Sequence, residues 1–426
     1  MTSVSWRPFS GFRAWWATAR QTRSILMIWL GWAALMFAFQ PLVLSRFDLV
    51  RPDQALDWTA AQTGSDRLQG HPYLASPLLG AHTAWDSEYY ISIALHGYDD
   101  PDMPAASPDS QPDTPIAGRK GDHPGWVALN HAFFPGYPLA MALLARPAIR
   151  LGAPPIPAAV LAGLAVSLLG TLGAMFSIAD LAGFAGGSPE RIRAAFYLCV
   201  WPGSIFLAQV YSEGLFVGLS FGALALLRRR RPELAALLAV AAVFTRPTGV
   251  LLQIPFAWTW WTRGPSTSPA RLLVALAPTL AWVAWRLLLG GDFGYVESRY
   301  FGRGPFAVGA SWDAWLEAAR TLRHGAHAAR AAVALEILAV VAAIAGSVLL
   351  WPRDKPLTLY GLALLAVAAT SGAAVGMQRY VVALPALFLA PARLGREPAI
   401  DRLWTLWCCL GLAVLALAFS FGFWAG

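Results

Sequence analysis

The sequence is poor in charged residues. Only 13% of its 426 residues are charged, whereas 57% are hydrophobic. A soluble domain would carry about 25% charged residues, so the composition excludes an ordinary soluble enzyme and indicates a polytopic membrane protein. The formal net charge is +8, but no basic run lies on a soluble face. We therefore expect no nucleic-acid partner and assign the positive charge to cytoplasmic loops.

Cysteine is also scarce. Cys199, Cys408 and Cys409 all fall in apolar stretches. Their odd number implies no disulfide framework and their spacing matches no metal site, so we interpret them as small apolar side chains. His324 and His327 lack a nearby carboxylate, a pattern more typical of solvated histidines than of metal ligands. We expect neither a metal nor another cofactor.

Long apolar segments take the place of the missing charge. The first, Ile25–Leu44, follows a run of scattered arginines and lacks a small-residue cleavage site. It therefore predicts a signal anchor with its N-terminus in the cytoplasm. Further spans are predicted at Ile156–Ala182, Ala194–Gln209, Glu213–Leu227, Leu234–Phe244, Gly249–Trp261, Leu272–Leu289, Ala331–Trp351, Leu357–Val375, Val381–Ala392 and Leu403–Trp424.

An arginine run at residues 228–231 orients these segments, because basic loops stay in the cytoplasm. The segment Phe133–Arg150 would place that run outside if it crossed the membrane. It is short and interrupted by Pro135 and Pro138, so we predict a juxtamembrane helix on the outer surface. About eleven spans remain, with the N-terminus inside and the C-terminus outside.

We expect one integral membrane domain over residues 1–426. Its large extracytoplasmic loops are predicted at residues 45–155 and 290–330. Residues 99–115, DDPDMPAASPDSQPDTP, are rich in Asp and Pro and are predicted to form a flexible loop without a core.

In this topology the polar and aromatic residues that interrupt apolar segments gather on the extracytoplasmic face. Ionisable residues at membrane depth are costly and usually functional. Carboxylates and arginines on one face indicate a site for an anionic substrate that arrives through the lipid. The candidate residues are Trp85, Asp86, Glu88, Tyr89, Tyr137, Tyr211, Glu213, Arg246, Arg299, Arg303, Arg379 and Tyr380.

Each charged candidate also has a purely structural interpretation. Asp86 could cap a surface helix, and Glu213 could favour the N-terminus of its span. Arg246 and Arg379 could be interfacial arginines that extend toward water. Asp86 and Glu88 could also hold a metal together, although the chemistry considered below does not require one.

The stretch AWDSEYYISIALHGY at residues 84–98, followed by HAFFPGYPLAM at 131–141, resembles the first luminal loop of the PIG-V family, the GPI mannosyltransferase 2 proteins. The sequence departs from the family pattern in its long insert at residues 99–115 and in Pro247, where the family usually has Ser. The resemblance continues through CVWPGSIF at 199–206, YSEGLF at 211–216, TRPTG at 245–249 and QRY at 378–380 with Leu384 and Pro385.

The resemblance implies a GT-C-type glycosyltransferase, a polytopic α-helical enzyme that uses a polyprenyl-phosphate sugar as donor. It also implies juxtamembrane helices in the first loop and a catalytic aspartate, which we assign to Asp86. A lipid phosphate is a good leaving group whose developing charge suits arginines. The acceptor hydroxyl needs one general base. A single base and direct displacement imply inversion.

The remaining candidates receive supporting roles. Arg246 and Arg379, and after them Arg299 and Arg303, are the phosphate candidates. Glu88 and Glu213 would shape the site or orient acceptor hydroxyls. The tyrosines at 89, 137 and 211 would line the entrance for sugar or lipid, with Trp85 and Tyr380 beside the substrate.

The predicted function is transfer of mannose or a similar hexose to a hydroxyl of a lipid-linked or glycan acceptor at the cell membrane. The alternative is a lipid or glycan transporter, which should show internal repeats that we do not find. The composition, rich in Ala, Arg and Pro, is typical of bacterial proteins, in which a GPI acceptor is not expected. The acceptor is therefore open between a glycolipid and a secreted protein, and mannose rests on the resemblance alone.

Overall fold

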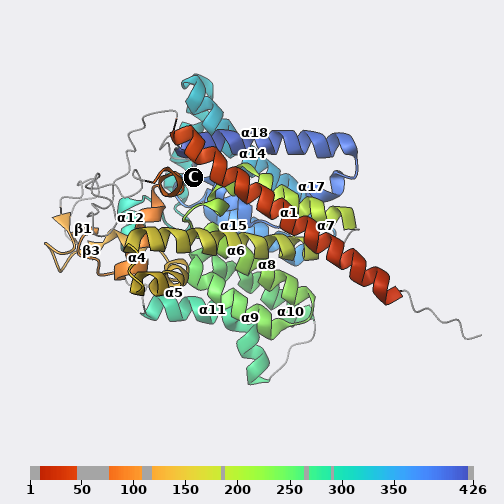
Figure 1. The fold of residues 1–426 in the computed structure, drawn as a ribbon, viewed down its shortest axis with the longest axis horizontal. Coiled ribbons are helices and arrows are strands. Elements are labelled where there is room, and N and C mark those ends of the chain that lie inside the picture. The colour runs from red at the N-terminus through yellow and green to blue at the C-terminus, as the bar shows by residue number, and fades with distance from the viewer. Residues whose placement is uncertain are drawn as a thin grey trace, which may run out of the picture.

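The computed structural model of the chain describes residues 10–45, 76–107, 118–183, 188–262, 268–288 and 292–420. Figure 1 shows packed helices with one small sheet at the edge of the assembly. The predicted helical membrane protein is confirmed, because helices dominate and several are long and apolar.

Five helices are long and apolar enough to cross a membrane, and each covers a predicted span. About eleven full spans were expected; among the described residues the other apolar segments form shorter helices. The five are α1 (Ser10–Leu44), α6 (Pro155–Gly183), α11 (Pro269–Leu288), α14 (His327–Leu350) and α18 (Pro398–Ser420).

The shorter helices are separated by irregular segments that often begin at proline, which cannot donate the backbone hydrogen bond that would continue a helix. Three predicted spans are each broken in two: Ala194–Gln209, Gly249–Trp261 and Val381–Ala392. The shorter helices formed by the remaining apolar segments, including those pieces, are α7 (Ser188–Val200), η3 (Pro202–Ala208), α8 (Glu213–Arg228), α9 (Pro232–Thr245), η4 (Pro247–Leu252), α10 (Gln253–Thr262), α15 (Lys355–Ala369), α16 (Met377–Tyr380), η5 (Val381–Ala383) and α17 (Ala386–Leu394).

The turn from η3 into α8 is a sharp break between two helical pieces. The two helices are bent by 102° and count as a sixth span only if they are taken together. Residues 201–214 are buried throughout. Irregular backbone at membrane depth is tolerated where protein surrounds it. The turn is therefore compatible with the protein interior, and its side chains can point in directions that a regular helix does not allow.

Helices α6 and α8 cross in direct backbone contact. A Cβ added at Gly214 would lie 2.3 Å from the carbonyl oxygen of Ser167, and one at Gly218 would lie 2.3 Å from that of Gly170. Small residues four apart allow this approach, as in many membrane helix pairs. The crossing fixes the start of α8, and with it Glu213, against α6.

Several of the segments outside these helices, among them the small sheet, lie at the left of Figure 1, whereas the helix over Val308–His324 packs against α14. Helix α5 covers most of the segment predicted to be a juxtamembrane helix. The elements are α3 (Pro77–Ala81), α4 (Asp86–His96), β1 (Pro104–Ala106), β2 (Gly118–Arg119), β3 (Val127–Ala128), η2 (Leu129–Ala132), α5 (Gly136–Arg150), α12 (Phe293–Tyr300) and α13 (Val308–His324).

The prediction of a flexible loop without a core at residues 99–115 was wrong for its first part. Strand β1 is the centre of a three-stranded antiparallel sheet with the order β2-β1-β3. Met103 is fully buried in a cluster with Ile91, and Asp100 accepts a hydrogen bond from Ser92 at 2.6 Å. The few apolar residues of the insert are therefore enough to anchor it on α4. Residues 108–115 lie outside the described part of the chain.

Candidate active site

Asp86 is the first residue of α4, and the chain enters this helix through an unusual backbone conformation. Trp85 has φ 55° and ψ −114°, a region that residues with a side chain rarely adopt and that costs about 1–3 kcal/mol. Trp85, not Asp86, occupies the N-cap position, and no side chain caps the helix. The interpretation of Asp86 as a helix cap is therefore wrong.

Three hydrogen bonds hold this entry in place of a cap. The Ser87 hydroxyl donates to the carbonyl of Ala84 at 2.9 Å and accepts from its N–H at 3.2 Å. The Tyr211 hydroxyl donates to the same carbonyl at 2.9 Å. The strained turn is thus fixed from two sides, which leaves the carboxylate of Asp86 available for another partner.

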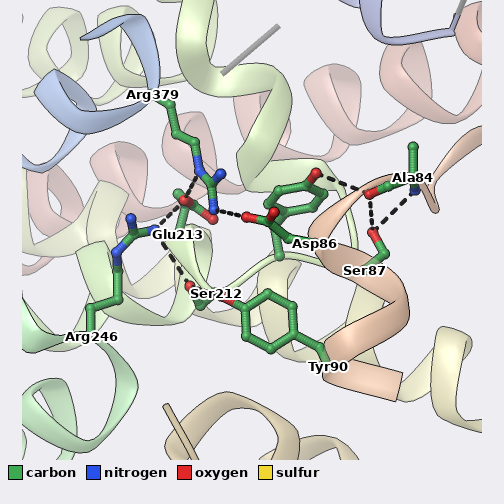
Figure 2. A network of polar contacts seen from close by, with 9 residues as sticks. Ala84, Asp86, Ser87, Tyr90, Ser212, Glu213, Arg246 and Arg379 are labelled. Carbon is green, nitrogen blue, oxygen red and sulfur yellow. Dashed lines mark hydrogen bonds and ion pairs between the residues drawn. The ribbon is translucent and has the colours of Figure 1, made fainter. Parts of the chain in front are cut away.

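That partner is Arg379. Its Nη2 lies 2.7 Å from Oδ2 of Asp86, while its Nε donates to Oε1 of Glu213. Nη1 of Arg246 donates to the same Glu213 oxygen. Figure 2 shows the four side chains converging from separate segments. We call Asp86, Arg379, Glu213 and Arg246 the ion-pair chain. It joins two positive and two negative charges.

The ion-pair chain is largely removed from solvent. The side chains of Arg379 and Glu213 are each 3% exposed, whereas those of Asp86 and Arg246 are 13% and 16% exposed. Charges in such surroundings need partners, because an isolated buried charge is very costly. The pairing satisfies that need, and the two outer members of the chain are its more exposed ones.

Two buried atoms of the chain keep unused hydrogen-bonding capacity. Nη1 of Arg379 and Oε2 of Glu213 have no hydrogen-bond partner within the described ranges. Buried polar atoms without partners are uncommon in native proteins. An unpaired guanidinium N–H beside a paired one offers a donor to an incoming anion.

The position of Arg379 depends on a tight fit around α16. Gly203 lies so close to this segment that a Cβ there would be 1.9 Å from the carbonyl oxygen of Gln378. The indole N–H of Trp201 donates to that same oxygen at 3.2 Å. On the other side, the carboxylate of Glu336 in α14 accepts the N–H groups of Gly376 and Gln378 at 3.0 and 2.9 Å.

Aromatic rings complete the surroundings of both arginines. The guanidinium of Arg379 lies 4.8 Å from the ring centroid of Tyr211, and that of Arg246 lies 5.8 Å from the ring of Tyr380. Such contacts favour a cation over an aromatic face. The Tyr90 hydroxyl donates to Ser212 at 2.9 Å (Figure 2). Burial, and next the charge of Glu213, raise the pKa of Tyr90, so that this hydroxyl stays protonated.

The predicted tyrosines do not share one role. Tyr137 and Tyr211 are fully buried. The Tyr137 hydroxyl donates to the carbonyl of Gly163 at 3.0 Å and so ties α5 to α6. Tyr89 stacks on Phe133 with ring centroids 4.6 Å apart. In the structure Tyr137 and Tyr211 support the site from within and do not line an opening.

Helix α12 brings in a residue that the sequence analysis missed. The pKa of Glu297 is raised to about 7, chiefly by burial; the charge of Asp86 adds to this shift, and Arg303, Arg246 and Arg379 oppose it. Glu297 is therefore within electrostatic reach of the ion-pair chain. Arg299 belongs to α12, and the Arg303 N–H donates to the carbonyl of Glu297 at 2.9 Å. Neither arginine is part of the ion-pair chain itself.

The described residues contain no group of three or more His, Cys, Asp or Glu side chains that could hold a metal ion. Asp86 and Glu88 are two positions apart in α4, and such positions do not face each other on a helix. Glu88 is 3% exposed, and Asp86 is paired with Arg379. The residues of the site thus suit an anion better than a cation.

Comparison with known proteins relates part of this chain to one family. The model of the family described as mannosyltransferase (PIG-V) matches residues 125–257. GPI alpha-1,6-mannosyltransferase 2 of Mus musculus is 30% identical over 213 residues, which cover 48% of this chain and 36% of the relative. The Cricetulus griseus protein of the same name is 32% identical over 182 residues, covering 42% and 31%. The chain therefore matches about a third of the length of these relatives.

Solved structures give a weaker likeness. The apo oligosaccharyltransferase of Archaeoglobus fulgidus aligns with a TM-score of 0.47 at 13% identity and covers 97% of this chain and 57% of that one. The motif containing Asp86 and the one containing Arg379 both lie outside the segment that the family model matches. Within residues 125–257, which contain Glu213 and Arg246, the chain is similar to the PIG-V mannosyltransferases, as its motifs predicted.

Proposed function

We propose that the protein is an inverting glycosyltransferase. It moves mannose or a similar hexose from a polyprenyl-phosphate donor to a hydroxyl of a lipid-linked or glycan acceptor. The observation that carries the proposal is the ion-pair chain, in which one partly accessible carboxylate and two arginines are held together with an unpaired guanidinium N–H.

The arginines suit the leaving group. As the bond from the anomeric carbon to the phosphate oxygen breaks, negative charge grows on the phosphate. Fixed guanidinium groups in a site of low dielectric stabilise such charge effectively. Nη1 of Arg379 is free to donate, and Arg246 approaches the same place from the end of α9. Arginine also matches phosphate with its planar fork of donors.

Asp86 suits the role of general base. An acceptor hydroxyl is a weak nucleophile and must lose its proton to a carboxylate during attack. Asp86 is more exposed than Glu213, which two arginines already occupy. The pairing with Arg379 fixes the orientation of Asp86 beside the phosphate donors. With one base and direct displacement of the phosphate by the acceptor hydroxyl, the anomeric centre is inverted.

The direction of α8 supports an extracytoplasmic reaction. This helix begins at Glu213 and ends at Arg228, next to the exposed arginines 229–231. Basic segments favour the cytoplasmic side, which supports an outer position for the opposite end of α8 and the ion-pair chain. A donor whose phosphate lies at this end keeps its polyprenyl tail in the lipid.

The test is transfer from radiolabelled polyprenyl-phosphate mannose by the purified protein, reconstituted with a lipid extract as the source of acceptor. Asp86→Asn keeps the size of the side chain but removes the base, so we expect transfer to fall by about 10²–10⁴-fold while the donor still binds. Asp102→Asn, which changes a 56% exposed carboxylate of the same loop, should retain activity. Normal turnover by the Asp86→Asn protein would refute the mechanism.

A further inference from the structure

The other end of α8 carries a second arrangement of arginines and carboxylates. Two adjoining cavities lie where α6, α7, α8, α14 and α17 meet. Their volumes are about 90 and about 260 Å³, and both are lined by Leu350, Arg353 and Arg393. The smaller one also contacts Arg228, and the larger one contacts Arg396. We call these four arginines and their cavities the arginine pocket.

Two buried carboxylates position part of the arginine pocket. Asp354 pairs with Arg228, and Glu190 pairs with Arg396; the two carboxylate side chains are 5% and 3% exposed. A basic loop that serves only to orient a membrane protein needs no such fixed geometry, because its charge alone determines the orientation. The carboxylates instead hold guanidinium groups at defined places on the cavity walls.

The arginine pocket has a surplus of positive charge. Four arginines and two carboxylates line it, a difference of +2. Arg393 lies within electrostatic reach of Arg353 and Arg396 as well as of Glu190. Like charges brought this close repel one another, and a bound anion removes that repulsion.

The apolar part of the lining indicates how such an anion is carried. Leu349 and Leu394 line the larger cavity and are each 44% exposed. Both cavities are smaller than the roughly 300–1,000 Å³ of a site that encloses a whole ligand. They fit a phosphate-sized group whose remainder extends along the exposed leucines. Basic pockets between membrane helices bind lipid headgroups in this way.

We propose that the arginine pocket binds a phosphate group, with an anionic membrane lipid as its favoured source. Guanidinium forks from Arg353 and Arg393 would contact the phosphate oxygens. Acyl chains would lie on the apolar surface beside Leu349 and Leu394. This site is separate from the ion-pair chain and does not rest on the proposed transferase activity.

Native mass spectrometry of the purified protein with phosphatidylglycerol or phosphatidylcholine tests this site. The wild-type protein should retain phosphatidylglycerol preferentially. The double variant Arg353→Gln with Arg393→Gln should lose about tenfold in affinity for it, because two charge-assisted contacts disappear. The matched control is Arg230→Gln with Arg231→Gln, which removes two exposed charges of the neighbouring run and should bind like wild type.

Further experiments distinguish a lipid from a soluble phosphate ester as the source of the phosphate, and they control for misfolding of the variant. Arg353→Lys with Arg393→Lys keeps the charge and should retain part of the preference. Glycerol 3-phosphate that displaces the lipid would identify a soluble phosphate ester as the ligand, and failure to displace it would identify the lipid. Equal phosphatidylglycerol retention by wild type and the folded Gln variant, or equal loss in the control, would overturn the proposal.

Discussion

The start and the end of α8 combine the same chemical groups in different proportions. At the start, the ion-pair chain balances two arginines against two carboxylates, and its central members are 3% exposed. At the end, four arginines face two carboxylates, and Arg396 is 68% exposed. Balanced charges can be kept dry, because each satisfies another. A surplus must stay near solvent or near an anion.

The two ends also differ in the backbone that carries them. Asp86 follows a strained turn and Glu213 follows a 102° bend. Arg379 belongs to the short helix α16, which is held tightly by its neighbours. The arginine pocket lies at the ends of regular helices. We infer that the ion-pair chain required special backbone geometry because its side chains must converge from several segments, whereas the arginine pocket uses positions that helix ends supply without strain.

Removal of one carboxylate from each end of α8 should give the largest difference in stability between the two ends. Glu213→Gln leaves two buried arginines without their shared acceptor, and we expect a loss of about 3–5 kcal/mol in unfolding free energy together with loss of transfer. Glu190→Gln affects an arginine that solvent can reach, and we expect about 1 kcal/mol or less. Thermal unfolding in detergent, followed by tryptophan fluorescence, measures both. Equal destabilisation would contradict the distinction.

Replacement of arginine by lysine should separate the two ends by kinetics. Arg379→Lys keeps the charge but cannot contact Asp86 and Glu213 together, so the donor KM should rise about tenfold or more, with less change in the acceptor KM. Arg246→Lys should act in the same direction but more weakly, because it loses contact with one carboxylate only. Arg228→Lys at the other end is the control. A donor KM that is unchanged in both site variants would remove these arginines from phosphate binding.

A methyl group at Gly203 should disturb the tight fit around α16, the helix that carries Arg379. The added Cβ would meet the carbonyl of Gln378 at 1.9 Å, so α16 must shift, and transfer should fall about tenfold through misplacement of the guanidinium. Gly173→Ala in α6 adds the same group where no atom lies within 4 Å and should be neutral. Transfer activity of the two variants, measured in parallel, tests this prediction. Normal activity of the Gly203→Ala protein would show that the tight fit around α16 is not needed for transfer.

The smallest expected effect concerns Glu297 and pH. Its pKa of about 7 lies above the ordinary 4.5, so the folded protein binds this proton more tightly than the unfolded chain. The contribution to stability is therefore fully present below pH 4.5 and is lost as pH rises through about 7. Glu297→Gln should flatten the fall in stability over this range, whereas Glu317→Gln, at 67% exposure, should not. Unfolding curves at several pH values would contradict the assignment if wild type and Glu297→Gln ran parallel.

The sequence predicted the members of the ion-pair chain because charged residues at the ends of apolar segments are conspicuous. It could not predict that Arg379 would contact both Asp86 and Glu213, since this pairing depends on how distant segments pack. Glu336 did leave a signal, a carboxylate inside the apolar segment Ala331–Trp351, and such residues are usually functional. Glu297 left none, because in sequence it lies in a polar loop between aromatic and basic residues.

The fold was predictable where apolar segments are long and uninterrupted. The five spanning helices follow directly from length and composition. The shorter segments were predicted as spans because their hydropathy is similar, but proline and glycine divide them into shorter helices. The small sheet was not predicted, because its strands are only two or three residues long and are too short to show an alternating pattern.

The length of α8 has a consequence for the depth of the reaction. Its 16 residues span about 24 Å at 1.5 Å per residue, whereas the hydrocarbon layer is about 30 Å thick. With Arg228 at one boundary, Glu213 lies about 6 Å below the other. Helix α9, with 14 residues, sets Arg246 at about 21 Å from its start by the same rule, and tilt deepens both. If the donor is the proposed polyprenyl phosphate, its phosphate must sink beneath the headgroup plane to reach the arginines, and local thinning of the bilayer should favour the encounter.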